Sequence, residues 1–442
     1  MSMVHIGKYT VKFTAVFLVI TAYAQNSLLP DIDYERQPEM IIFIHGSMQP
    51  PEWRIGDLIK VMRDKIENSI YLRAAQYLRK DPFFTQGQAM QGEGLCKIDL
   101  TNPTSASSII AQMCEYQYQW SGNRAQRFYY TFGWNGVVHL YTRYEEAKNL
   151  LYQLCIELKR LRATGIDPKI KIIAYSHGGN VALNLAAVQD DDPSLLIEPF
   201  VVDELIMFAT PVQRATDYLV GRDMFKKVYH FYSCNDGIQT LDFTCPKQFF
   251  SKRLFQNRKG FKVPSSLVQI RMRTTKRLIS RSKKFRDSCT DYTFLHDKRF
   301  RHVRHDPKHT EFWNFQWGSS TYRDLFTLAP LPVVVFYPSI ITTLQQKFPD
   351  LTSLVFDYAP SHGGAVVIDR TTKKTSSVKM LSQDQLDNMY ELAHASGKKT
   401  LDLHEQKEHL RSAMKKAEDD YNEEHPHTLS YGHLMKLAYL IR

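Results

Sequence analysis

One serine stands in a pattern that favours nucleophilic chemistry. Ser176 lies between small residues in the segment Ala174-Tyr175-Ser176-His177-Gly178, which follows an apolar run and precedes a helix-forming one. A serine on a sharp strand-to-helix turn can attack a carbonyl carbon, provided that its flanking residues are small. The usual motif of such a turn is G-x-S-x-G. Here alanine stands at 174 in place of the first glycine, and its single methyl group is tolerable. The alternative is that Ser176 caps an ordinary helix.

A nucleophilic serine needs a base that takes its proton and a carboxylate that orients the base. Asp236, in a turn after an apolar run, is the predicted acid, and Asp242 is the second candidate. His309 is the predicted base, because Pro307 ends the preceding element and Glu311 follows where a helix can open. The other histidines that stay open as the base are His296, His302, His305 and His362.

A metal site is the competing interpretation of three of these histidines. His302, His305 and His309 have the spacing H-x-x-H-x-x-x-H, which could bind a transition metal. Their surroundings are strongly basic, and no glutamate is placed as in H-E-x-x-H. Binding of a metal cation by these histidines is therefore disfavoured. The sequence therefore predicts neither a metal ion nor a cofactor.

A second motif supports the serine. The run Phe43-Ile44-His45-Gly46-Ser47 ends an early apolar stretch with His-Gly. An oxyanion can be stabilised by the amide after a nucleophile together with an amide from the loop after an early strand. We expect the N–H groups of His177 and of Ser47 or Met48 to have this role. Taken alone, His-Gly is only a strand-to-loop turn.

The elements that must position these residues alternate along the chain. Amphipathic helix patterns occupy 52–80, 144–161 and 181–188. Short apolar runs typical of buried parallel strands lie at 40–44, 128–133, 170–174, 204–209, 228–232 and 265–272. This alternation predicts an α/β fold, with a mostly parallel sheet and helices on both of its faces. Carboxyl ends of parallel strands meet at one edge, so we expect His309 to reach the Ser176 hydroxyl there.

Taken together, these segments resemble the α/β-hydrolase superfamily, and more narrowly its lipase and esterase branch. The residues that carry the likeness are F-I-H-G at 43–46, A-Y-S-H-G-G-N at 174–180 and Y-S-C-N-D at 232–236, with W-N-G at 134–136 before a long helix. The likeness covers roughly residues 38–315 and has the chain order Ser, Asp, His expected for such a triad.

The resemblance implies a serine hydrolase that cleaves a carboxylic ester, of a lipid or a small molecule, through an acyl-serine intermediate. Amide hydrolysis uses the same machinery and stays open. The alternative from a different class is a catalytically silent α/β-hydrolase fold that serves as a surface-binding or host-interaction module.

The first residues have the pattern of a secretory signal peptide. Lys8 and Lys12 precede an apolar run at 13–22, and an A-x-A site ends before Gln25. The run is too short to span a bilayer as a helix. The alternatives to a cleaved signal are a buried N-terminal helix and an uncleaved membrane anchor. We expect residues 1–24 to be removed and the protein to be exported, to the periplasm or the medium.

The remaining chain is divided by composition. Residues 25–319 are expected to form the hydrolase-like domain, with a candidate cap at 81–125 and a basic insertion at 252–308. Residues 320–442 are expected to be a C-terminal α+β extension, in which 331–336, 354–358 and 365–369 look strand-like.

Positive charge is concentrated in residues 252–308, which hold 18 lysines and arginines against 4 aspartates, in a chain of net charge +11. This segment is solvated surface or attracts a polyanion, such as an anionic membrane surface. No recognition motif accompanies it, so sequence-specific nucleic-acid binding is disfavoured.

Six cysteines in an exported protein permit disulfides. Cys96 with Cys114, and Cys234 with Cys245, are close enough in the chain to close short loops.

Overall fold

The computed structural model describes residues 36–47, 70–81, 92–101, 105–240, 250–277, 302–316, 328–359, 363–397 and 403–425. The predicted signal peptide, Met48, Asp242, His296 and His362 lie outside these ranges. None of the helices in the described ranges has the length and apolarity needed to cross a bilayer.

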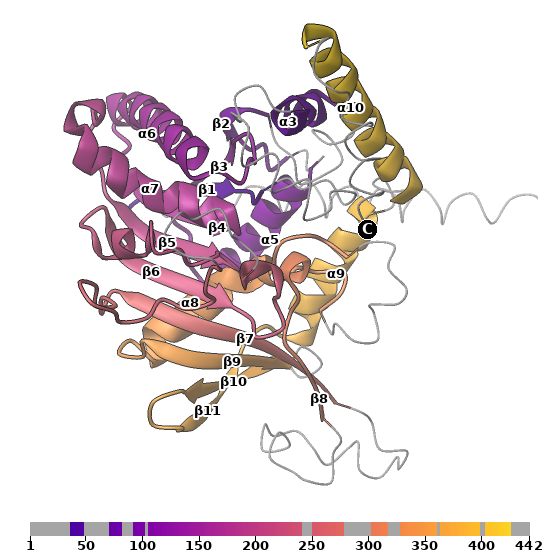
Figure 1. The fold of residues 1–442 in the computed structure, drawn as a ribbon. Coiled ribbons are helices and arrows are strands. Elements are labelled where there is room, and N and C mark those ends of the chain that lie inside the picture. Colours follow the sequence, from indigo (N-terminus) through magenta and orange to yellow (C-terminus); the bar gives the residue numbers. More distant parts are fainter. Residues whose placement is uncertain are drawn as a thin grey trace, which may run out of the picture.

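The described strands form one mostly parallel sheet of 11 strands, in the order β11-β10-β9-β7-β6-β5-β4-β1-β3-β2, with β8 paired to β7 (Figure 1). Strands β1, β3, β4, β5, β6, β7 and β9 run parallel, while β2, β8, β10 and β11 are antiparallel to their neighbours. The strands are β1 (Glu39–Ile44), β2 (Gly94–Lys97), β3 (Arg127–Gly133), β4 (Lys169–Tyr175), β5 (Val202–Phe208), β6 (Phe225–Tyr232), β7 (Leu267–Arg277), β8 (His302–His305), β9 (Ser353–Ala359), β10 (Gly364–Asp369) and β11 (Thr375–Lys379).

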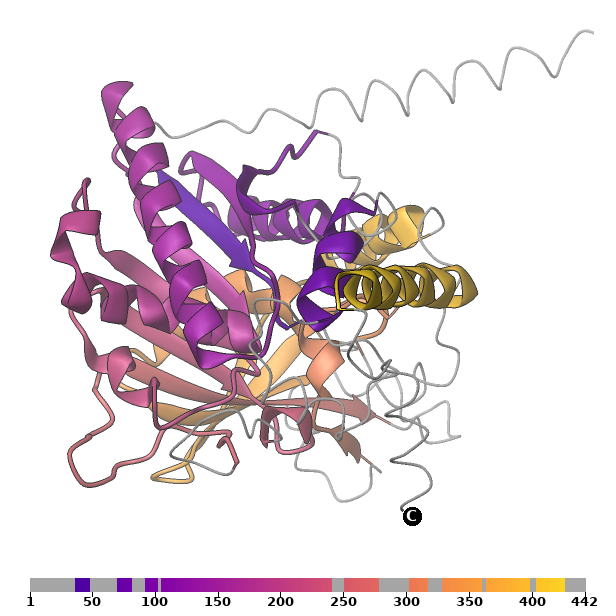
Figure 2. The same ribbon diagram turned by 45° about the horizontal axis from the view of Figure 1, so that its top comes forward.

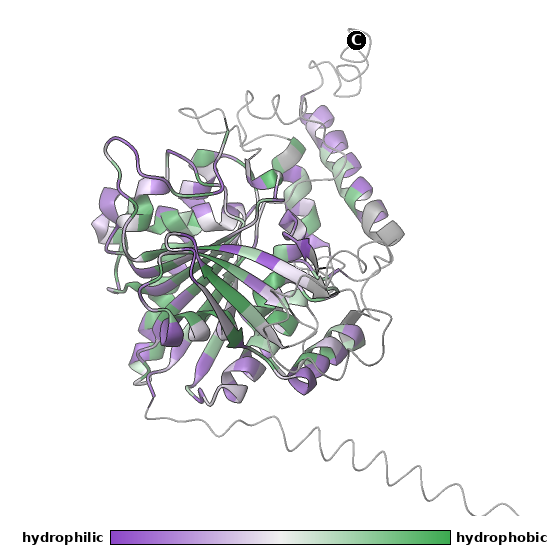
Figure 3. Cartoon of the chain, turned by 90° about the horizontal axis from the view of Figure 1, so that it is seen from below, coloured by the Kyte–Doolittle hydropathy of each residue, from purple (hydrophilic) through white to green (hydrophobic). Residues whose placement is uncertain are grey.

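Helices cover both faces of this sheet. The helices are α3 (Ile70–Lys80), α5 (Ala106–Trp120), α6 (Leu140–Ala163), α7 (His177–Asp191), α8 (Tyr337–Lys347), α9 (Gln383–Gly397) and α10 (Leu403–Glu424). Along β1, Ile41 and Phe43 join the core under α5, α8 and α9, whereas Ile42 and Ile44 join the core under α6 and α7. Alternate residues of a strand point to opposite faces, so a continuous apolar run serves both cores. Figure 3 shows several central strands in the green of apolar residues. The predicted α/β architecture is confirmed.

The C-terminal part of the chain completes the same sheet. Strand β9 pairs with β7 in parallel, and β10 and β11 continue outward from it. The strand predicted at 265–272 is present as β7, and β9 and β10 cover the later runs predicted at 354–358 and 365–369. The run at 331–336 is not a strand: it contains the 3-10 helix η8 (Val333–Phe336), preceded by Pro330 and Pro332. Prolines lack the N–H that a sheet ladder needs.

Elements of the sheet and its helical layers lie in two segments that were expected to stand apart from it. Within 81–125, β2 is an edge strand of the sheet and α5 belongs to its helical layer. Within 252–308, β7 is an integral strand of the sheet, so the segment is not an insertion as a whole. Cys96 and Cys114 are both free thiols, and no disulfide joins them.

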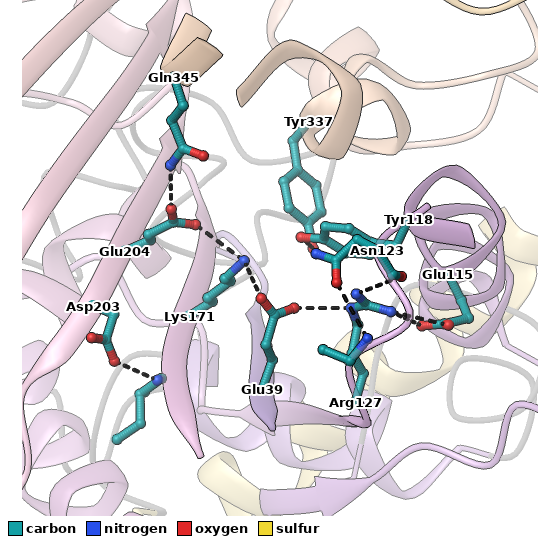
Figure 4. A network of polar contacts seen from close by, with 12 residues as sticks. Glu39, Glu115, Tyr118, Asn123, Arg127, Lys171, Asp203, Glu204, Tyr337 and Gln345 are labelled. Carbon is teal, nitrogen blue, oxygen red and sulfur yellow. Dashed lines mark hydrogen bonds and ion pairs between the residues drawn. The ribbon is translucent and has the colours of Figure 1, made fainter. Parts of the chain in front are cut away.

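A network of charged residues is buried near the amino ends of the central strands, at the edge opposite Ser176 (Figure 4). The Lys171 ammonium lies 2.9 Å from a Glu39 carboxylate oxygen and 3.4 Å from one of Glu204. The Arg127 guanidinium lies 2.9 Å from the other Glu39 oxygen and 4.0 Å from the ring centroid of Tyr118. Burial opposes the charge on Lys171, but Tyr118 and the two glutamates outweigh it and raise the pKa of Lys171.

We expect Lys171→Met to lower the free energy of unfolding by about 3–5 kcal/mol, because it removes from a buried network the cation that Glu39 and Glu204 share. Urea unfolding of the variant measures this loss. The matched control is Lys226→Met, which removes a lysine from an exposed pair with Asp203 and should cost less than about 1 kcal/mol. Equal losses in the two variants would contradict the structural role of the network.

Candidate active site

Ser176 occupies a strained turn between β4 and α7. Its backbone angles are φ 50° and ψ −129°, in a region that non-glycine residues rarely adopt. The Ser176 N–H donates to the Phe208 carbonyl of β5 at 2.8 Å, and the Ser176 carbonyl accepts from the Gly179 N–H at 3.0 Å. Neighbouring backbone therefore holds the strained conformation, as functional sites often require.

Close packing explains the glycines around this turn. A Cβ atom on Gly178 would lie 2.4 Å from the His45 carbonyl oxygen, and one on Gly46 would lie 2.8 Å from the Ser176 Cβ. Only glycine fits at either position without displacing backbone or the serine itself. The His-Gly loop predicted after the first strand is thus in direct contact with the serine turn.

The structure brings the three predicted side chains together in one hydrogen-bonded line. His309 Nε2 lies 3.0 Å from Ser176 Oγ, and His309 Nδ1 lies 2.7 Å from Asp236 Oδ2. The other Asp236 oxygen accepts the Gln239 N–H at 3.0 Å. Ser176, His309 and Asp236 are 4%, 8% and 0% exposed. This geometry suits a ring that donates to Asp236 and can accept the serine proton.

A buried carboxylate holds the segment that carries His309. Glu311, 1% exposed, accepts the Lys308 N–H at 2.6 Å and lies 2.7 Å from His305 Nε2. These contacts shape the 3-10 helix η7 (His309–Phe312), which follows Pro307. The short helix behind the ring is present as the sequence predicted.

An aromatic stack fixes the other side of His309. The Tyr175 hydroxyl donates to the His309 carbonyl at 3.1 Å, and the two rings lie 5.0 Å apart. Tyr175 also stacks on Trp313 at 5.4 Å. Burial, with a smaller contribution from the charge of Asp236, raises the pKa of Tyr175 well above its usual value, so the hydroxyl stays a donor.

The competing metal interpretation does not match these contacts. His305 and His309 bind two different carboxylates, those of Glu311 and Asp236. In the described residues, no three histidine, cysteine, aspartate or glutamate side chains are arranged to hold a metal ion.

Of the predicted oxyanion residues, His177 directly follows Ser176 and Ser47 lies in the loop that contacts it, while Met48 is outside the described residues. His177 is the first residue of α7, and the amino-terminal N–H groups of a helix face out of its end. Its side chain is buried and hydrogen-bonded to Arg143. Ser47 follows Gly46, whose contact with Ser176 places this loop at the nucleophile.

Two residues that contact the His-Gly loop were not predicted as part of the site. The Trp134 indole N–H donates to the His45 carbonyl at 2.7 Å, and Arg79 donates to His45 Nε2 at 2.8 Å. The W-N-G segment at 134–136 was a usable signal for the first contact. No local pattern marks Arg79, which lies 34 residues from His45 in the chain.

No protein-family model matches the chain, and no curated protein matches it. Among solved structures, it is similar to a lipase-esterase related protein from Clostridium acetobutylicum ATCC 824, with 12% identity, a TM-score of 0.18, and coverage of 41% of this chain and 46% of that one. It is also similar to the Tle1 effector in its complex with the VgrG spike of the Type 6 secretion system, with 13% identity, a TM-score of 0.21, and coverage of 46% and 47%. The chain spans less than half the length of each of these proteins.

Proposed function

We propose that this protein is a serine hydrolase of the α/β-hydrolase type, which cleaves a carboxylic ester of a lipid or small molecule through an acyl-serine intermediate. The observation that carries the proposal is the line from Ser176 through His309 to Asp236. The strained turn under Ser176 supports it further, because it presents the hydroxyl at the carboxyl ends of the parallel strands.

In the proposed reaction, His309 Nε2 takes the proton of Ser176 as Oγ attacks the ester carbonyl carbon. The carbonyl oxygen becomes an oxyanion, which the N–H groups of His177 and Ser47 stabilise. His309 then gives its proton to the leaving alcohol, and the acyl group stays on Ser176.

The second half of the reaction reverses these roles. His309 takes a proton from a water molecule, which attacks the acyl carbon and forms a second oxyanion. Collapse of that intermediate returns the proton to Ser176 Oγ and releases the carboxylic acid. Asp236 keeps the His309 ring in one tautomer throughout and stabilises its cation.

A fluorophosphonate probe tests the proposal, because it forms a covalent bond only with an activated serine. We expect stoichiometric labelling of the native protein, on the peptide that contains Ser176, and none in Ser176→Ala or in urea-denatured protein. Native protein that folds but is not labelled would contradict the hydrolase and favour a silent fold used for binding.

A further inference from the structure

The loop next to the nucleophile is held by a hydrogen-bonded side chain. His45 Nδ1 lies 2.6 Å from the Gly46 carbonyl oxygen. That carbonyl and the Ser47 N–H belong to one peptide plane, which is trans, so they point in opposite directions. Fixing the carbonyl therefore fixes the direction of the Ser47 N–H beside Ser176.

The His45 ring is itself held in one state. Its Nε2 accepts from Arg79 Nη2 at 2.8 Å and from the backbone N–H of Trp134 at 3.3 Å. Only the neutral tautomer with a proton on Nδ1 therefore satisfies all the partners of the ring. Burial and the charge of Arg79 lower the pKa of His45 to about 3, and the ring stays neutral near pH 7.

Arg79 reaches this ring from the last turn of α3. Arg79 is 4% exposed, although arginine is rarely buried. Its Nη1 atom lies so close to Gly133 that a Cβ atom on this residue would be only 2.8 Å from it. The position of this guanidinium therefore depends on where α3 lies.

Helix α3 is positioned by α10, more than 300 residues later in the chain. The two helices lie side by side in Figures 1 and 2. Ala417 packs with Ile70 and Ala74, and Ala413 packs with Leu78. Polar contacts at the ends of α3 join Arg73 to Glu424 at 2.7 Å and Asp81 to His409 at 2.6 Å. A helix of 11 residues is marginal by itself, so α10 supplies the surface that keeps α3 in place.

We propose that Arg79 and His45 are positioning residues that hold the Ser47 amide ready for the oxyanion, and that α10 maintains this arrangement by packing against α3. The inference rests on the proposed function, because the Ser47 amide is positioned for an oxyanion that forms only in that reaction.

The first test is Arg79→Met, which keeps the length and apolar packing of the side chain. Loss of one oxyanion donor costs about 10²–10³ in kcat, so a loosened donor should cost about 10–100-fold with p-nitrophenyl butyrate. KM should change less than about twofold, and a boronic-acid transition-state analogue should bind more weakly by the factor lost from kcat. Arg79→Lys, which keeps the charge and a donor, should retain more activity.

The matched control is Lys80→Met, which removes the same charge from the next, exposed residue of α3. It should leave kcat unchanged. Equal kcat values in Arg79→Met and Lys80→Met would overturn the role of Arg79.

The role of α10 is tested with Ala417→Arg, which places a long charged side chain in the contact with α3. We expect a loss of kcat similar to that of Arg79→Met, and no further loss in the double variant, because both changes release the same contact. Ser412→Arg adds the same side chain at an exposed position of α10 and should be silent. Independent, additive losses would overturn the link between α10 and Arg79.

A readout without catalysis separates the two proposals. The ¹⁵N shifts of the His45 ring should report the Nδ1–H tautomer in the native protein and in Ser176→Ala, and should change in Arg79→Met. If the ring responds but no ester is cleaved, the contact stands and the proposed function fails. If esters are cleaved and neither kcat nor the ring responds, this inference fails and the hydrolase stands.

Discussion

Replacing Ser176 with alanine is expected to lower kcat/KM for ester hydrolysis by about 10⁴-fold or more, since loss of a triad nucleophile removes the covalent pathway. The remaining rate comes from binding and the oxyanion amides alone. The variant should fold normally, because alanine keeps the small side chain that packs beside Gly46. Steady-state kinetics with p-nitrophenyl butyrate and a thermal unfolding curve measure the two effects.

The control for this variant is Ser194→Ala, which removes an exposed hydroxyl outside the site and should leave the rate unchanged. Activity of Ser176→Ala above about a tenth of the native value would exclude Ser176 as the nucleophile, because removing a catalytic nucleophile lowers the rate by many orders of magnitude.

The second large effect is expected for Asp236→Asn, which should lower kcat by about 10²–10⁴-fold with little change in KM. The Asp236 carboxylate accepts from His309 Nδ1, whereas an amide there can donate to Nδ1 and favour the wrong tautomer. His309 then presents a proton, rather than a lone pair, to Ser176. The double variant of Asp236→Asn and His309→Gln should be no slower than His309→Gln alone, because the residues act as a unit.

Asp242→Asn is the informative control, since Asp242 is the second candidate acid by sequence. It should retain kcat within about twofold, as expected of a residue outside the triad. A larger loss in Asp242→Asn than in Asp236→Asn would exchange the two assignments.

The parts of the site that could be predicted are those whose chemistry and geometry are local in the chain. The turn at Ser176 is formed by a strand, a few small residues and a helix in direct succession, so its pattern is complete within 170–188. His45-Gly46 is likewise set by the end of one strand. Asp236 follows β6 closely, and parallel strands bring such carboxyl ends to one edge whatever separates them in sequence.

The choice of His309 over the other histidines was decided by tertiary structure. A long connection separates β7 from His309, and its length says little about where it returns. The structure shows that β8 pairs antiparallel with β7, with His305 opposite Thr274, and so leads the chain back to the sheet edge. His305, four residues earlier, contacts Glu311 instead, a difference that depends on side-chain directions in space.

By itself, the amino-acid sequence determined the alternation of strands and helices, the serine turn and the residue types around it, because these depend on neighbours within a few residues. Strand patterns do not state which strand is the partner, so only the tertiary structure decided that β9, β10 and β11 extend the main sheet. The same holds for Arg79, which reaches the loop of His45 only because α10 packs on α3. Contacts between distant segments follow from how whole elements pack, and the pattern of any one segment carries no record of its partner.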